Sequence, residues 1–378
     1  MKILLAFGTR PEIIKLGPVY RALRRRGVRP DTFWSGQHVE LAEGLLDLFG
    51  IAITHRGSDI VGESGLAGKF GLMVQQIDRA IEPHHYDWIV VQGDTATAAA
   101  AATAGFMRRI PVAHVEAGLR TGDIRSPWPE EFNRRLVALA TNLHFPPTAQ
   151  ARDNLLQEGV LDDHIVTVGN TVIDALLYAR KKIHDGYEPI NGELASLPAD
   201  KKLVLATLHR RENIGEPLRR VLRALRTLAN DGDKLILLPV HMNPQVRGDV
   251  VEILGDVPNV RLVKPLQYTD FVYVLDRAWA VVSDSGGVQE EAPTFGLQVV
   301  ITRETTERPE VVRAGFGTLV GSDCHAIVNL VRRLTGGSRP QLLSAANPFG
   351  RGDSSDRIAA RLVNEFTADQ KTGFAVAA

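Results

Sequence analysis

Short apolar runs alternate with helical stretches along almost the whole chain, and they do so in two separate series. In the first series the predicted strands are KILLAFG, VRPDTFWSG, DWIVVQGD, IPVAHVEAG, NLHFPP and HIVTVGN. The predicted helices between them include Lys15–Arg26, Val39–Phe49, Thr95–Arg108 and Pro129–Ala140. The strands are continuously apolar, which is typical of a parallel sheet covered by helices on both faces.

The second series of predicted strands starts near Lys201. It reads KKLVLATLH, KLILLPVH, NVRLVKPL, WAVVSDSGG, LQVVITR and FGTLVG, and a polar, proline-containing stretch of about residues 182–200 precedes it. A chain of 378 residues is too long for one ordinary core. We therefore expect an α/β protein of two Rossmann-like, doubly wound domains, over residues 1–170 and 171–353, facing one another across a cleft.

The charge balance makes some classes of partner improbable. Lys plus Arg and Asp plus Glu number 44 each, so the formal net charge is zero, and we expect neither nucleic acid nor an anionic membrane as a partner. No apolar run reaches the roughly 18 residues of a membrane helix, and the first run is too short for a signal peptide, so the expected location is the cytoplasm. The single cysteine, Cys324, can form neither an intrachain disulfide nor a cysteine zinc cluster.

Polar residues gather where the predicted strands end. In open parallel sheets ligands bind at the carboxyl ends of the strands. Arg10, Asp94 and Glu116 follow strands of the first series, and His209 and His241 follow strands of the second. We expect each set to lie at one edge of its sheet.

The stretch VVSDSGGVQEEAP carries the strongest phosphate signal. A strand runs into Ser285, Gly286 and Gly287, after which a helix begins. Two glycines let backbone N–H groups approach a phosphate at the positive end of a helix. Glu290 or Glu291 would suit ribose hydroxyls. The alternative is a tight turn with acidic residues that complement the helix dipole.

The opening FGTRPEIIK combines a helix start with an extra cation. Thr9 and Glu12 fit a capping box, and Pro11 suits the first helical turn. Neither explains Arg10, whose guanidinium can bind a diphosphate with two hydrogen bonds. Lys15 follows on the same helix, as a second phosphate ligand or as a solvated surface residue.

Three carboxylates are candidates for acid–base chemistry. Asp94 and Glu116 each follow a buried strand, and Glu130 follows the proline-rich turn SPWP. Glu131 is expected to pair with the arginines three and four residues further on, which leaves Glu130 as the freer carboxylate. Acids that share a site raise one another's pKa, which suits proton transfer. A magnesium site is the alternative, although the chain has no DxD spacing.

His209 and His241 end two strands of the second series and could donate to phosphate or transfer protons. A zinc site is poorly supported because the chain has neither HExxH nor cysteine partners.

With these residues assembled, the chain resembles the non-hydrolysing UDP-N-acetylglucosamine 2-epimerases. The matching motifs, in order from Lys2 to about Ile358, are FGTRPEIIK, QGDT, HVEAGLRTGD, SPWPEEFNRR, VGNTVIDAL, HRREN, PVHMNP, SDSGGVQEEAP and TTERPE. The resemblance implies a glycosyltransferase-B-like fold that binds the nucleotide between its domains, with a C-terminal helix of about residues 354–368 joining the first domain. It implies interconversion of UDP-GlcNAc and UDP-ManNAc, by elimination of UDP to a 2-acetamidoglucal and its re-addition, which would supply a ManNAc-type precursor for surface polysaccharide. It also implies no cofactor, no metal and a homodimer.

The resemblance assigns roles to the candidate residues. The catalytic group would be Asp94, Glu116, Glu130 and His209, without deciding which carboxylate removes the proton and which returns it. The residues that hold the substrate, chiefly its diphosphate, would be Arg10, Lys15, His241, Ser285, Gly286, Gly287 and Arg308. Glu291 would bind the ribose, and Leu266 and Phe271 would line the uracil pocket.

Two departures from the family pattern stand out. Many members are activated by a second UDP-GlcNAc near a QHxxM stretch; this chain has Gln37 and His38 as a possible regulatory site but continues VELAEG, so activation stays open. It has QGDT where HGDT is commoner, and we expect that difference, at Gln92, to be minor.

Other activities stay open as alternatives. A hydrolysing epimerase would release free ManNAc, and a 2-epimerase of a UDP-diacetamido sugar would change only the sugar pocket. A glycosyltransferase of the same fold would leave the extra carboxylates unexplained, and a non-catalytic sensor should have lost them.

Overall fold

The computed structural model of the protein describes residues 1–36, 39–58, 65–210, 213–240, 243–341 and 347–372. The chain divides into two compact units. The first consists of Met1–Ala175 with Gly350–Ala378, and the second of Leu176–Phe349.

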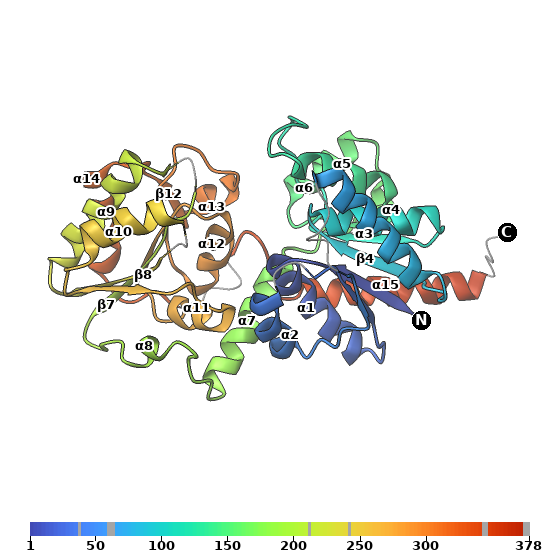
Figure 1. The fold of residues 1–378 in the computed structure, drawn as a ribbon, viewed down its shortest axis with the longest axis horizontal. Coiled ribbons are helices and arrows are strands. Elements are labelled where there is room, and N and C mark those ends of the chain that lie inside the picture. The colour runs from blue at the N-terminus through green and yellow to red at the C-terminus, as the bar shows by residue number, and fades with distance from the viewer. Residues whose placement is uncertain (37–38, 59–64, 211–212, 241–242, 342–346, 373–378) are drawn as a thin grey trace. The chain divides into compact units, whose positions relative to one another are not determined.

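The first unit is built on a six-stranded sheet whose order is β3-β2-β1-β4-β5-β6, with every neighbouring pair parallel (Figure 1). The order reverses between β1 and β4, as in doubly wound folds. The strands are β1 (Ile3–Phe7), β2 (Asp31–Trp34), β3 (His55–Arg56), β4 (Trp88–Gln92), β5 (Val112–Val115) and β6 (Leu143–Phe145).

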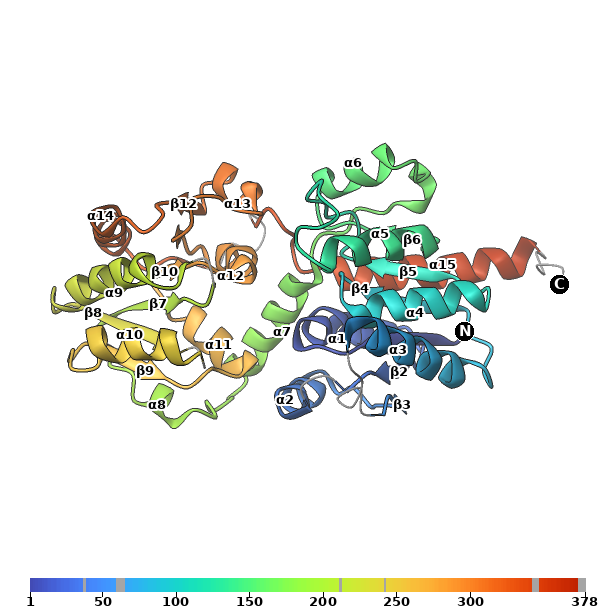
Figure 2. The same ribbon diagram turned by 45° about the horizontal axis from the view of Figure 1, so that its top comes forward.

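Helices cover both faces of this sheet (Figures 1 and 2), with α3, α4 and α5 on one side and α1 and α15 on the other. The helices of this unit are α1 (Arg10–Arg25), α2 (Val39–Phe49), α3 (Gly65–Ile81), α4 (Ala96–Met107), α5 (Glu130–Ala140), α6 (Ala149–Gln157) and α15 (Ser354–Thr372), with a short 3-10 helix at Asp162–His164. The alanines of α4 are buried against the sheet, α3 and α5, because small side chains let a helix approach on several sides.

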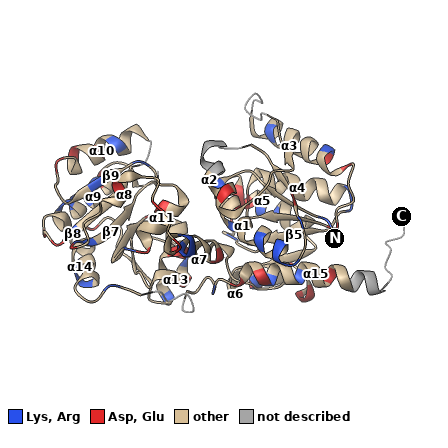
Figure 3. Ribbon diagram, turned by 90° about the horizontal axis from the view of Figure 1, so that it is seen from below, with Lys and Arg blue, Asp and Glu red and all other residues tan. Residues whose placement is uncertain are grey.

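The helix α15 is fixed to the first unit at its N-terminus. The buried Asp174 carboxylate accepts hydrogen bonds from the backbone N–H and the hydroxyl of Ser355, at 2.8 and 2.5 Å. The next residue, Asp356, pairs with Arg25 and Arg26 at the end of α1. Figure 3 shows both basic and acidic residues on α15.

The second unit repeats the same architecture with a sheet of order β12-β11-β10-β7-β8-β9, again all parallel. Its strands are β7 (Lys202–Thr207), β8 (Lys234–Pro239), β9 (Val260–Val263), β10 (Ala280–Ser283), β11 (Val299–Ile301) and β12 (Gly317–Leu319). Its helices are α8 (Gly192–Ala195), α9 (Glu216–Ala229), α10 (Pro244–Leu254), α11 (Tyr268–Leu275), α12 (Gly286–Glu291), α13 (Pro309–Arg313) and α14 (Cys324–Thr335), with a 3-10 helix at Ala292–Phe295. The large core packs α9, α10 and α14 against the sheet.

The helix α7 (Thr171–His184) carries the chain from the first unit into the second. The polar stretch that follows it is packed rather than loose. The buried Asp270 of α11 accepts hydrogen bonds from the Tyr187 hydroxyl and from the backbone N–H groups of Ile190 and Asn191.

Two details of the first sheet differ from the sequence prediction. HIVTVGN is not a strand: Ile165 forms one isolated bridge with His144, and Val166 and Val168 donate backbone hydrogen bonds to the β6 segment without a regular ladder. The sixth strand is instead β3, whose two residues are polar and carry no apolar run.

None of the helices in the described part of the chain combines the length and the apolar character that a membrane crossing needs.

Two buried histidines predict how the first unit responds to pH. His114 on β5 and His144 on β6 are register partners, and burial lowers their pKa values from 6.5 to about 4 and about 3. The unfolded chain therefore binds protons that the folded chain does not, so stability falls as pH drops below about 6.5. We expect the free energy of unfolding to fall by about 2 kcal/mol per histidine between pH 7 and pH 5, measured by urea denaturation.

His114→Gln should reduce this pH dependence, because the amide can still donate to the Gly93 carbonyl that lies 2.8 Å from His114 Nε2. His325→Gln, at an exposed position of α14, is the control and should leave it unchanged. An unaltered slope in His114→Gln would contradict the assignment.

Candidate functional site

The start of α1 places the first candidate residues at the carboxyl edge of the first sheet. The predicted capping box is confirmed: Thr9 is the N-cap and Glu12 closes the box. Glu12 is fully buried, which raises its pKa, and it accepts hydrogen bonds from the backbone of Gly8 and from the Thr95 hydroxyl. Glu12 thus joins the loop after β1 to the loop after β4, and Arg10 lies at the first residue of α1, half-buried.

Glu116 lies just past β5, in a strained backbone conformation with φ of 63°. Its backbone N–H donates to the Phe145 carbonyl at 3.0 Å. Its buried carboxylate accepts from Lys15 Nζ at 2.5 Å and Asn170 Nδ2 at 3.2 Å through Oε1, and from Gln92 Nε2 through Oε2. Lys15 is therefore not a solvated surface lysine; it forms an ion pair with a candidate catalytic carboxylate.

Asp94 follows β4 and is held by α5. The Arg134 guanidinium binds its Oδ2 through Nε at 2.8 Å and through a terminal nitrogen at 2.7 Å, and Asn133 donates to its backbone carbonyl. The Asp94 side chain keeps partial exposure, so it is accessible to a ligand.

The two glutamates at the start of α5 have different surroundings. Glu131 is fully buried and pairs with Arg134 at 3.0 Å and Arg135 at 3.5 Å, as the spacing predicted. Within the described residues Glu130 has no hydrogen-bond or ion-pair partner and is half-buried. Of the pair, Glu130 is the carboxylate available to a ligand.

In the second unit, a buried aspartate organises the loop that follows β7. Asp284, just past β10, accepts from the backbone N–H groups of His209 and Arg210 and from the Asn213 amide, and lies 3.2 Å from His209 Nδ1. Burial would raise the pKa of Asp284, but these hydrogen bonds outweigh it and lower the pKa. The imidazole of His209 is exposed at this edge, with its Nδ1 side fixed.

The Ser285-Gly286-Gly287 segment begins α12, with Ser285 as its N-cap. Neither glycine has a positive φ, so the backbone conformation does not require glycine here. A Cβ built on Gly286 would come no nearer than 3.7 Å to the Arg210 guanidinium, and one on Gly287 no nearer than 3.9 Å to Ser285. These are ordinary van der Waals distances, so the packing does not require glycine here either, and the phosphate interpretation stays a prediction.

The remaining candidates of the second unit lie around α11 and α12. Arg308 binds the buried Glu290 carboxylate, and its backbone N–H donates to Thr306. Glu291 and Leu266 are buried, and Phe271 on α11 is half-buried.

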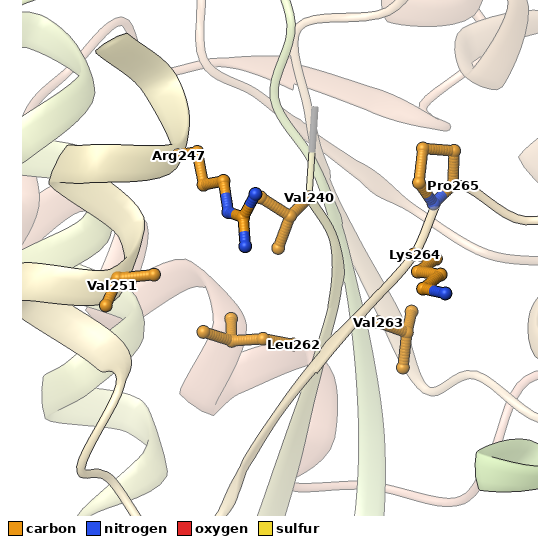
Figure 4. A pocket seen from close by; sticks show the side chains of 7 residues that line it. All are labelled: Val240, Arg247, Val251, Leu262, Val263, Lys264 and Pro265. Carbon is orange, nitrogen blue, oxygen red and sulfur yellow. The ribbon is translucent and has the colours of Figure 1, made fainter. Parts of the chain in front are cut away.

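A pocket of about 470 Å³ opens beside the edge strand β9 (Figure 4). Apolar side chains of β9, of α10 and of Val240, just past β8, line it together with Pro265, and Arg247 and Lys264 are its charged members. It comes within one residue of Leu266 along the chain, but neither Leu266 nor Phe271 lines it.

Three candidates, His241, Gln37 and His38, fall outside the described residues. Sequence reasoning missed the groups that hold the candidates, namely Gln92, Asn170, Arg134 and Asp284. Gln92 and Asn170 stand inside the motifs QGDT and VGNT, which was the signal available. Over the part of the chain that the structure describes, no group of three or more His, Cys, Asp or Glu side chains is arranged to hold a metal ion.

Comparison with known proteins agrees with this arrangement. A family model described as UDP-N-acetylglucosamine 2-epimerase matches residues 21–363. The UDP-N-acetylglucosamine 2-epimerase of Escherichia coli K12 is 42% identical over 377 residues, which cover 96% of this chain and 99% of that protein.

Solved structures agree as well. The UDP-GlcNAc 2-epimerase of Neisseria meningitidis, solved with bound UDP-GlcNAc, has a TM-score of 0.85 and 36% identity over 96% of this chain and 100% of its own. A glycosyltransferase of kitacinnamycin shares the fold alone, with a TM-score of 0.60 and 14% identity over 98% of both chains. The fold is thus the Rossmann-like glycosyltransferase-B type.

The Asp284 cluster gives a test of the second unit. Asp284→Ala removes the acceptor of two backbone N–H groups and one of the two acceptors of the Asn213 amide, so we expect a loss of about 3 kcal/mol at pH 7 in urea denaturation. Because the folded pKa lies below the unfolded value, the advantage of the wild type is present above about pH 4 and shrinks as pH falls further. Asp256→Ala, at an exposed position of the same unit, should cost little; equal losses would contradict the role of Asp284.

Proposed function

The chain belongs to the UDP-N-acetylglucosamine 2-epimerase family, and on that premise we propose that it interconverts UDP-GlcNAc and UDP-ManNAc without net hydrolysis. The observation that carries the proposal is the set of carboxylates at the carboxyl edge of the first sheet. Asp94 and Glu116 are held there by cations, and Glu130 is left without a partner among the described residues.

The proposed reaction is an elimination followed by a re-addition. A carboxylate removes the proton from C2 of the sugar, and the C2–H electron pair forms the C1=C2 double bond. The C1–O bond breaks, its electron pair stays on the diphosphate oxygen, and UDP departs from a 2-acetamidoglucal. Re-addition of UDP at C1, with a proton delivered to the other face of C2, gives the epimer and restores every atom.

The C2 proton is weakly acidic, so the reaction needs both a positioned base and a stabilised leaving group. The carboxylates Asp94, Glu116 and Glu130 would transfer the protons. His209, whose imidazole is held by Asp284 at the carboxyl edge of the second sheet, would be the fourth member of the catalytic group. Glu116 and Asp94 accept hydrogen bonds from the cations Lys15 and Arg134, which fix the orientation of both carboxylates.

The leaving diphosphate needs cations and backbone donors. We propose that Arg10, Lys15 and His241 act with the Ser285-Gly286-Gly287 backbone and Arg308 in this role. Glu291 would bind the ribose, while Leu266 and Phe271 would contact the uracil. The solved relative with bound UDP-GlcNAc supports a UDP-sugar as the ligand. The product would serve as a ManNAc-type precursor for surface polysaccharide.

We also propose that two copies of the chain associate through α4 and α5, which pack against each other in the first unit. At their ends Phe106, Met107 and Leu139 are exposed, with 60%, 71% and 85% of their surface accessible. Large apolar side chains so exposed on neighbouring helices mark an interaction surface.

The function is tested by proton NMR of the purified protein with UDP-GlcNAc in D2O. We expect UDP-ManNAc to appear with deuterium at C2, because the removed proton exchanges before it is returned. Supplying UDP-ManNAc instead should give the same mixture from the other side.

Two other results of this NMR experiment would each indicate a different activity. Free ManNAc with UDP would move the protein to the hydrolysing class. An unchanged spectrum would contradict the proposed substrate and favour a UDP-diacetamido sugar or a glycosyltransferase with an acceptor.

The dimer is tested by light scattering during gel filtration. Met107→Glu with Leu139→Glu should reduce the measured mass from that of two chains to that of one. Ile190→Glu, a change at an apolar residue 65% exposed in the second unit, is the control and should leave the mass unchanged. A wild type of single-chain mass would contradict the proposal.

A further inference from the structure

The carboxylate of Glu116 is surrounded by donors from three separate parts of the first unit. Lys15 comes from α1, Gln92 from the last residue of β4, and Asn170 from the residue that precedes α7. Their contacts with Glu116 span 101, 24 and 54 residues of sequence. Local chain geometry does not bring such groups together; the fold does.

The donors use both carboxylate oxygens. Oε1 accepts from Lys15 and Asn170, and Oε2 accepts from Gln92. Within the described residues every partner of this carboxylate is a donor. The cluster thus favours a single rotamer of the Glu116 side chain.

Gln92 and Asn170 are themselves buried, with 3% and 2% of their surface exposed. A buried carboxylate with its polar partners is costly compared with apolar residues of the same volume. The positive φ of Glu116 adds backbone strain. Stability alone does not account for a strained, buried, charged group with two buried amides facing it.

We propose that Gln92 and Asn170 are positioning residues for the Glu116 carboxylate: the two amides hold its oxygens in the orientation that the reaction requires. This rests on the proposed function of Glu116 in the epimerisation. Amides suit the task because they carry no charge at any pH, so the Lys15–Glu116 pair stays electrically balanced. Gln92, which the sequence suggested was a minor difference, thereby gains a direct contact with the reacting group.

The kinetic test compares Gln92→Leu and Asn170→Leu with Gln92→His. Losing one donor should lower kcat by about 10- to 100-fold, because a misplaced catalytic group costs that much, while KM for the UDP-sugar changes by less than about threefold. An imidazole Nε2 can donate from nearly the position of the amide nitrogen, so Gln92→His should recover most of kcat.

A double-mutant cycle separates positioning from a general effect on the fold. In a Glu116→Gln background the carboxylate is gone, so Gln92→Leu should lower the residual rate by less than about twofold. Asn259→Leu is the control: it removes a half-buried amide that donates to the Ala229 carbonyl of the second unit, and kcat should stay unchanged. Wild-type kcat in both leucine variants, or equal losses with and without the Glu116 carboxylate, would overturn the proposal.

Crystal structures test the positioning role independently of activity. One structure is of Gln92→His, and the other is of a leucine variant, either Gln92→Leu or Asn170→Leu. We expect Glu116 to keep its rotamer in the histidine variant and to leave it in a leucine variant. If a leucine variant does not fold, the histidine variant and the cycle of rates still test the contact. A wild type without epimerase activity would refute the proposed function, whereas an unmoved Glu116 in a leucine variant would refute the positioning role alone.

Discussion

The loops at the carboxyl edges of both sheets depend on one kind of interaction, a buried carboxylate that accepts several hydrogen bonds from neighbouring loops. Glu12 joins the loops after β1 and β4 in the first unit. Asp284 joins the loops after β10 and β7 in the second. Burial dominates at Glu12 and raises its pKa, while a histidine and several N–H donors dominate at Asp284 and lower it. Arg10 and Asp94 adjoin the residues that Glu12 holds, and His209 and Ser285 adjoin or belong to the Asp284 contacts.

Much of the fold was predictable because its strands are buried on both faces and are therefore apolar throughout. The alanine-rich helix α4 was predictable for the same reason, since small residues mark close packing. The prediction of a strand at HIVTVGN was wrong, because an apolar run beside a sheet can donate single backbone hydrogen bonds without forming a ladder. The strand β3 was missed because two polar residues paired at an edge leave no apolar pattern.

The site was predictable only where its contacts are local. The pairing of Glu131 with the arginines of the same helix follows from helical spacing, and so does the capping box of α1. The contacts of Glu116 with Gln92 and Asn170 do not, because they depend on how β4, β5 and the segment before α7 are brought together. From the sequence these amides stand out only as members of motifs. Their contacts with the Glu116 carboxylate are visible only in the fold.

The attachment of α15 has a consequence for the order in which the protein is made. Ile358, Ala359 and Leu362 of this helix are fully buried in the first unit, although the whole second unit precedes them in the chain. During synthesis the ribosome therefore releases the sheet of the first unit before the second unit, and the covering helix only after it. The surface of α1 that α15 covers thus stays exposed until every residue of the second unit has been made.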